Sequence, residues 1–165
     1  MQEFERYVSG YLPQYISIDD ELRMLMKSLP QVKEQNQRIQ QLKTQISQQQ
    51  SEVNRAVLNT TRERTKVDKL KRAGLTSLMA KIQNKRDEKL VKHESAYYSC
   101  VSKEKAAKSA LSGLELQLAD ENAVLRDLNA KKDRFHYLKK EMDNLLDQMF
   151  RMSYNAYPKD RELQN

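Results

Sequence analysis

The chain has 165 residues, of which 38% are apolar and 32% charged, with three Gly, three Pro and no Trp. This composition excludes a thick globular core and is typical of long helices and coiled coils, whose core is a narrow seam. The formal net charge of +7 favours polyanions as partners: nucleic acid, anionic lipid or acidic proteins.

Three further features of the sequence narrow the class of protein. The single cysteine, Cys100, excludes an intramolecular disulfide framework and fits a reducing compartment. No apolar run reaches the roughly 18–20 residues of a membrane-spanning helix. The first residues contain acids where a signal peptide has a positive start and an apolar block. We therefore expect a cytoplasmic protein that can bind a membrane only peripherally.

The N-terminal part of the chain predicts a mixed segment and then a short helix. Residues 1–16 show no clean hydrophobic period, and a glycine and a proline interrupt them. Ser17 is a candidate N-cap, because acids that suit a helix N-terminus follow it. The helix predicted from it covers residues 17–29 and ends or kinks at Pro30, which lacks a backbone donor.

A heptad repeat follows and predicts a first long arm over residues 31–72. The a positions are Val32, Ile39, Ile46, Val53, Thr60 and Val67. The d positions are Gln35, Leu42, Gln49, Ala56, Glu63 and Leu70. Aliphatic residues fill nearly all a positions over five heptads, which strongly indicates a coiled coil. Because several d positions are polar, we expect the seam to be loosely packed in places.

Residues 73–84 are predicted to form a basic, amphipathic tip between two arms. Gly74 suits a helix C-terminus, where a left-handed residue is favoured. Asn84 is a plausible N-cap for the next helix, because acids follow it. Between these signals, one apolar face is formed by Leu75, Leu78, Met79 and Ile82.

A second long arm is predicted over residues 85–154, followed by a polar tail over residues 155–165. Its first seam consists of Leu90, His93, Tyr97, Cys100, Glu104, Ala107, Leu111, Leu114, Leu118, Glu121, Leu125, Leu128, Lys132 and Phe135. The period then shifts, and the seam continues through Leu138, Met142, Leu145, Met149 and Met152. The shift resembles a three-residue discontinuity, which overwinds a coiled coil locally.

The lengths of the arms favour one topology: an all-α, elongated, antiparallel coiled-coil hairpin. At about 1.5 Å per residue the first arm measures roughly 60 Å and the second roughly 100 Å. If the chain folds back near Leu78, paired residues have numbers that add to about 157. The surplus of the second arm is then covered by residues 4–29. Since two helices alone bury little surface, we expect a homodimer that forms a four-helix bundle.

The excess charge of the chain lies between Arg62 and Lys92. Eleven Lys/Arg face four acids in this stretch, which equals the net charge of +7 of the whole chain. We predict that it contacts an anionic membrane or an acidic partner through apolar and basic residues together. These residues are Leu75, Leu78, Met79, Ile82, Lys69, Lys71, Arg72, Lys81, Lys85 and Arg86. Two alternatives remain open: the apolar residues plug the end of the hairpin, or the cations bind nucleic-acid phosphates without reading bases.

Enzyme chemistry finds no support in the sequence. The two histidines, His93 and His136, are about 65 Å apart if they lie on one straight helix. The chain contains no CxxC, no HExxH and no phosphate-binding glycine loop. His93 and Cys100 fall on the predicted seam, where packing is the ordinary role of such residues. We therefore expect a non-enzymatic scaffold without catalytic, cofactor or metal site.

The tip and the start of the second arm contain a sequence pattern that resembles one in other proteins. A short apolar turn precedes a basic and acidic cluster and then Lys-Glu-x-x-x-Tyr, and the matching residues are Leu75, Ser77, Leu78, Asn84, Lys85, Glu88, Glu94 and Tyr98. This pattern resembles long coiled-coil proteins of fungi and bacteria to which no role is assigned. It covers about a quarter of the chain. The resemblance implies a helical hairpin and no particular activity.

Overall fold

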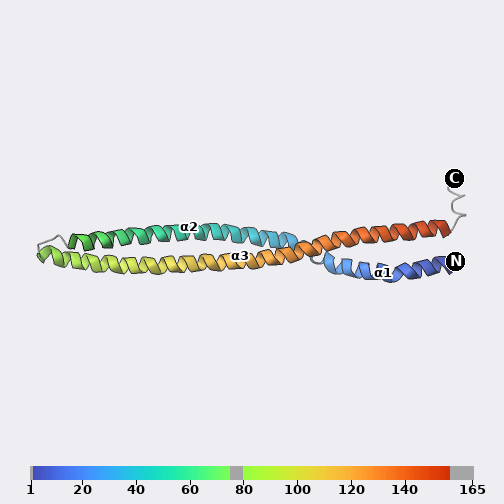
Figure 1. Ribbon diagram of the computed structural model, residues 1–165, viewed down its shortest axis with the longest axis horizontal. Coiled ribbons are helices and arrows are strands. Elements are labelled where there is room, and N and C mark those ends of the chain that lie inside the picture. The colour runs from blue at the N-terminus through green and yellow to red at the C-terminus, as the bar shows by residue number, and fades with distance from the viewer. Residues whose placement is uncertain (1, 75–79, 157–165) are drawn as a thin grey trace. The chain divides into compact units, whose positions relative to one another are not determined.

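The computed structural model describes the backbone of residues 2–74 and 80–156, and side chains for residues 5, 6, 9–72 and 87–154. Within these ranges every regular element is an α-helix, so the predicted all-α class is confirmed. α1 spans Gln2–Met26, α2 spans Leu29–Gly74 and α3 spans Ala80–Ala156 (Figure 1).

Contacts within the chain divide it into two compact units. Unit 1 combines the described residues up to Gln37 with those from Asn122 onward, and therefore contains α1 and the C-terminal part of α3. Unit 2 comprises Arg38–Glu121, which is most of α2 and the N-terminal part of α3. Each unit is built on a pair of helices with its own apolar seam.

In unit 2, α2 and α3 lie side by side and antiparallel (Figure 1). The side-chain amide Nε2 of Gln49 donates a hydrogen bond to the carbonyl oxygen of Ala107 at 3.1 Å. Further along, Nδ1 of His93 lies 3.3 Å from Oε2 of Glu63. In both pairs the residue numbers add to 156, close to the sum of about 157 expected from the arm lengths. The pairing agrees with the predicted antiparallel hairpin.

The seam of unit 2 follows the predicted heptad. Five of the predicted seam residues of α2 are at most 6% exposed in this unit: Ile39, Leu42, Val53, Thr60 and Val67. The facing seam positions of α3, from Leu90 to Glu121, are half-buried. The buried hydroxyl of Thr60 donates to the carbonyl oxygen of Ala56 at 2.9 Å, so its hydrogen-bonding need is met inside its own helix. The predicted seam positions are confirmed by their burial.

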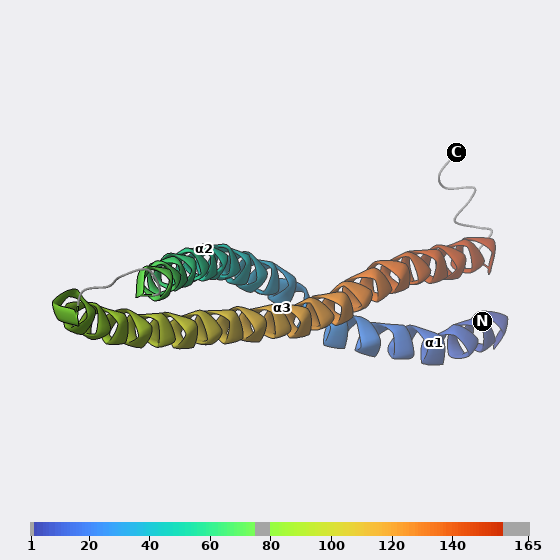
Figure 2. The same ribbon diagram turned by 60° about the vertical axis from the view of Figure 1, so that its left-hand side comes forward.

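In unit 1, α1 packs on the C-terminal part of α3 (Figure 2). The core of this unit is formed by Ile18, Leu138, Met142 and Leu145, with Tyr11, Tyr15, Leu22, Leu25 and Met149 packed around it. Beside the core, Nε and Nη2 of Arg134 donate to the two carboxylate oxygens of Glu21 at 2.9 and 3.3 Å. This bidentate pair marks the alignment of the two helices, although its half-exposed side chains contribute little to stability.

The predicted shift of the seam in α3 is visible in unit 1. Lys132, which continues the first frame, is exposed, whereas Phe135 and Leu138 are buried. Met142 and Leu145 continue the shifted frame and are also buried. The seam therefore changes frame between Phe135, the last position of the first frame, and Leu138.

The N-terminal helix differs from the prediction. α1 begins at Gln2 and runs through Gly10, Pro13 and Ser17, so Ser17 is not its N-cap. A proline inside a helix costs about 3 kcal/mol, because a backbone hydrogen bond is lost and the ring crowds the preceding turn. Tyr11 and Tyr15, which flank the proline, pack against the core on α3. Tertiary packing of these two tyrosines offsets the cost of the proline. The residues near Pro13 in the sequence gave no sign of this packing.

The other helix boundaries also shift. The break between α1 and α2 lies at Lys27 and Ser28, where the backbone N–H of Ser28 donates to the carbonyl oxygen of Leu25 at 2.9 Å. Pro30 lies in the first turn of α2, where its missing N–H is not required. The described part of α2 extends to Gly74, two residues beyond the predicted end of the first arm. α3 already includes residues 80–84, so Asn84 is inside a helix and is not an N-cap.

Candidate functional site

The described part of the basic stretch lies at the end of unit 2, where α2 ends and α3 begins. Five of its cationic residues are exposed and form no ion pair with any described residue: Arg62, Lys69, Arg72, Lys89 and Lys92. They come from both helices of the pair. Because the helix ends are connected by five residues, these cations are held on one end of the unit. Such an arrangement raises the local concentration of anions.

Three of the ten predicted contact residues have described side chains. Lys69 and Arg72 are exposed, as a contact surface requires, and Lys71 is exposed but pairs with Glu94, with Nζ 3.6 Å from Oε1. The remaining predicted residues fall into two groups. The backbone of Lys81, Ile82, Lys85 and Arg86 belongs to α3, and their side chains lie outside the description. Leu75, Leu78 and Met79 lie outside the described residues.

Two of the acids near this end form pairs within the protein. Glu63, on the seam of α2, accepts from Nζ of Lys66 at 3.2 Å and lies 3.3 Å from Nδ1 of His93. Hydrogen bonding to His93, and then to Lys66, lowers the pKa of the Glu63 carboxyl below its ordinary value. Glu94 is held by Lys71. Two carboxylates are thus engaged internally. Asp68, Asp87 and Glu88 are exposed at the same end without an ion pair to a described residue, so the five cations exceed the free acids by two.

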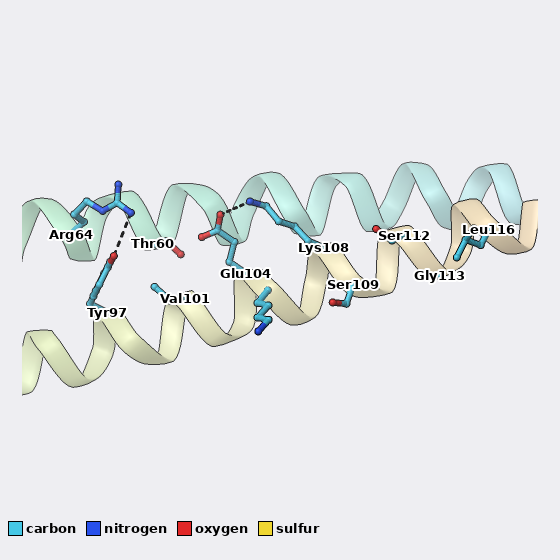
Figure 3. Close-up of a pocket in the computed structure, with 11 residues that line it drawn as sticks. Thr60, Arg64, Tyr97, Val101, Glu104, Lys108, Ser109, Ser112, Gly113 and Leu116 are labelled. Carbon is cyan, nitrogen blue, oxygen red and sulfur yellow. Dashed lines mark hydrogen bonds and ion pairs between the residues drawn. The ribbon is translucent and has the colours of Figure 1, made fainter.

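A second feature of unit 2 is an open groove between α2 and α3, with a volume of about 690 Å³ (Figure 3). α2 contributes Thr60 and Arg64 to it. The lining residues from α3 are Tyr97, Val101, Glu104, Lys105, Lys108, Ser109, Ser112, Gly113 and Leu116. The groove combines apolar surface, small residues and three cationic side chains on one side of the helix pair.

One end of the groove is ordered by Arg64. Its Nη2 donates to the hydroxyl oxygen of Tyr97 at 3.3 Å, and its guanidinium carbon lies 5.8 Å from the centre of the Tyr97 ring. Further along, Nζ of Lys108 lies 2.9 Å from Oε1 of Glu104. This hydrogen bond lowers the pKa of the Glu104 carboxyl below its ordinary value. Lys105, which also lines the groove, is exposed and forms no ion pair with a described residue.

The sequence analysis did not identify this groove. Lys105 and Ser112 lie beside the seam of α3, and the heptad assigns such positions to the solvated flank. One signal was available in Gly113, a glycine inside a long helix, which costs about 1 kcal/mol against alanine. Nothing lies within 4 Å of the position that a Cβ would take there. Packing inside the described chain therefore does not account for this glycine.

Neither a metal site nor a membrane-spanning helix is found among the described residues. No group of three or more His, Cys, Asp or Glu in them is placed to hold a metal ion. None of the described helix segments is both long and apolar enough to cross a membrane. The chain matches no protein-family model, no curated protein and no solved structure. The resemblance to long coiled-coil proteins of fungi and bacteria remains a prediction.

Proposed function

We propose that the protein is a non-enzymatic coiled-coil scaffold whose basic end binds an anionic surface, either that of a membrane or that of an acidic protein. The observation that carries this proposal is the group of exposed cations from two helices, Arg62, Lys69, Arg72, Lys89 and Lys92, without ion pairs among the described residues. The protein would act in the cytoplasm and associate with a membrane peripherally.

Physical chemistry favours lipid as the anionic surface. Each Lys or Arg near an anionic bilayer contributes about 1 kcal/mol. The sequence places apolar residues between the two groups of cations. The largest of them are Leu75, Leu78, Met79 and Ile82. Apolar side chains that enter the headgroup boundary add to the electrostatic attraction. Nucleic acid would use the same cations but would gain nothing from the apolar residues.

Co-sedimentation with vesicles tests the proposal. The native chain should sediment with anionic vesicles and not with neutral ones, and a Leu75→Ser/Leu78→Ser/Ile82→Ser variant should lose this binding. A matched variant, Met24→Ser/Met26→Ser/Leu58→Ser, removes exposed apolar side chains elsewhere and should bind as the native chain does. Absence of native binding to anionic vesicles would refute a membrane role. Duplex DNA binding that survives in the first variant would instead favour nucleic acid.

We further propose that the scaffold is a homodimer with its interface on unit 1. Four large apolar residues there are exposed by 45% or more: Leu12, Ile16, Leu146 and Phe150. Each directly follows a residue that lies in the core or packs against it. Glu21 and Arg134, which directly precede the core residues Leu22 and Phe135, are in contact.

Glu21 and Arg134 each directly precede a seam residue on their own helix. Their contact shows that residues directly before seam positions lie on one side of this antiparallel pair. Positions following the seam therefore share the opposite side, and the four apolar residues form one face. Two such faces packed together would complete a four-helix bundle. Sedimentation equilibrium should give twice the chain mass of 19.4 kDa, and a Leu146→Glu/Phe150→Glu variant should be monomeric. A monomeric native chain would contradict this part of the proposal.

A further inference from the structure

The groove of unit 2 is long enough to bind one additional helix. Its lining on α3 runs from Tyr97 to Leu116, which corresponds to about 29 Å of helix at about 1.5 Å per residue. A helix laid along it would be roughly 20 residues long. Val101 and Leu116 line the groove and are 38% and 69% exposed, so the groove offers apolar contact that the described chain leaves uncovered.

The part of the groove floor formed by α3 permits a close approach of another backbone. Ser109, Ser112 and Gly113 carry little or no side chain, and the space beside Gly113 is open to at least 4 Å. Glycine is favoured where a backbone or ligand approaches closely, because a Cβ would occupy that space. The exposed position of Gly113 therefore leaves room for an occupant from outside the described chain.

The charges of the groove select the occupant. Arg64, Lys105 and Lys108 line it against a single acid, Glu104, which Lys108 already holds at 2.9 Å. A second copy of this chain would place the same patch against itself in a symmetric contact, so cations would meet cations. Complementary charge on a partner favours association and suppresses wrong partners. An acidic helix fits the groove better than a second copy does.

We infer that this groove binds an amphipathic, acidic helix of another protein, with its apolar face on Val101 and Leu116 and its carboxylates near Lys105 and Arg64. The bound state is a local three-helix arrangement on unit 2. The inference does not depend on membrane binding, because the exposed cations proposed for that role are other residues and the following test contains no lipid.

A displayed library of helical peptides of roughly 20 residues tests the inference with the full-length protein. The peptides share a Leu/Ile seam, and each flanking position varies between Glu and Lys. Selection should enrich Glu-rich sequences. The selected peptide, measured by fluorescence anisotropy, should bind a Lys105→Glu/Lys108→Glu variant roughly tenfold more weakly, because the pair with Lys105 is lost and two new acids in the groove repel the peptide's carboxylates.

Two further variants exclude trivial explanations. Lys43→Glu/Lys103→Glu makes the same change in net charge at exposed positions outside the groove, and it should bind the peptide like the native chain. Gly113→Leu fills the open space without changing charge and should weaken binding, while circular dichroism shows an intact helix. The inference is overturned if no peptide or a Lys-rich peptide is selected. Equal losses in the groove variant and in its charge-matched control would overturn it as well.

Discussion

An Ala56→Cys variant is expected to form an intramolecular disulfide with the native Cys100 on mild oxidation. Ala56 and Cys100 are half-buried seam residues that line the same cavity between α2 and α3. They occupy directly opposed positions in the alignment set by Gln49 with Ala107. The bridge would close a loop of about 45 residues, which stabilises the folded state by roughly 4 kcal/mol in the chain-entropy model.

The bridge is detected as faster migration on a non-reducing gel and as a higher urea midpoint that reductant reverses. A Leu58→Cys variant serves as the control, because Leu58 is 58% exposed on the same helix and should form no bridge with Cys100. If Ala56→Cys retains free thiols or forms only intermolecular bridges, the antiparallel alignment of α2 and α3 is incorrect.

Replacing Leu42 by alanine is expected to destabilise the protein by about 2–5 kcal/mol, the usual cost of truncating a buried leucine. Leu42 is 6% exposed on the seam of α2, and truncation leaves a cavity that a two-helix seam cannot fill from other layers. Urea unfolding followed by circular dichroism measures the loss. Leu58→Ala is the same substitution at an exposed position of the same helix and should change the stability by about 0.5 kcal/mol or less. Similar losses for both variants would mean that the heptad assignment does not describe the core.

The seam could be predicted from the sequence because its signal is periodic. Val53 and Val67 are both a positions, and both are buried. Even Thr60, a polar residue in the series, is 4% exposed, so its position in the repeat decided its burial. The same repeat predicted the shift after Phe135, because Leu138 is apolar and buried, whereas the next position of the first frame, Lys139, is exposed.

The start of α1 and the groove could not be predicted, for two different physical reasons. Pro13 argues locally against a helix, and the packing of Tyr11 and Tyr15 on α3 outweighs it. Such a gain depends on a segment more than a hundred residues away in the sequence. The groove arises where Arg64 of α2 and Lys105 of α3 come to the same side of the pair. That juxtaposition requires the alignment of the helices as well as their periods.

The most direct test of the central claim uses tryptophan fluorescence, since the native chain contains no Trp. A Leu78→Trp variant reports on the apolar part of the basic end, and a Leu58→Trp variant reports on an exposed position of α2 outside it. The proposal predicts that anionic vesicles shift the emission of the Leu78→Trp variant to shorter wavelength, that neutral vesicles do not, and that the Leu58→Trp variant is unaffected. Unchanged emission of Leu78→Trp with anionic vesicles would contradict membrane contact at this end of the protein.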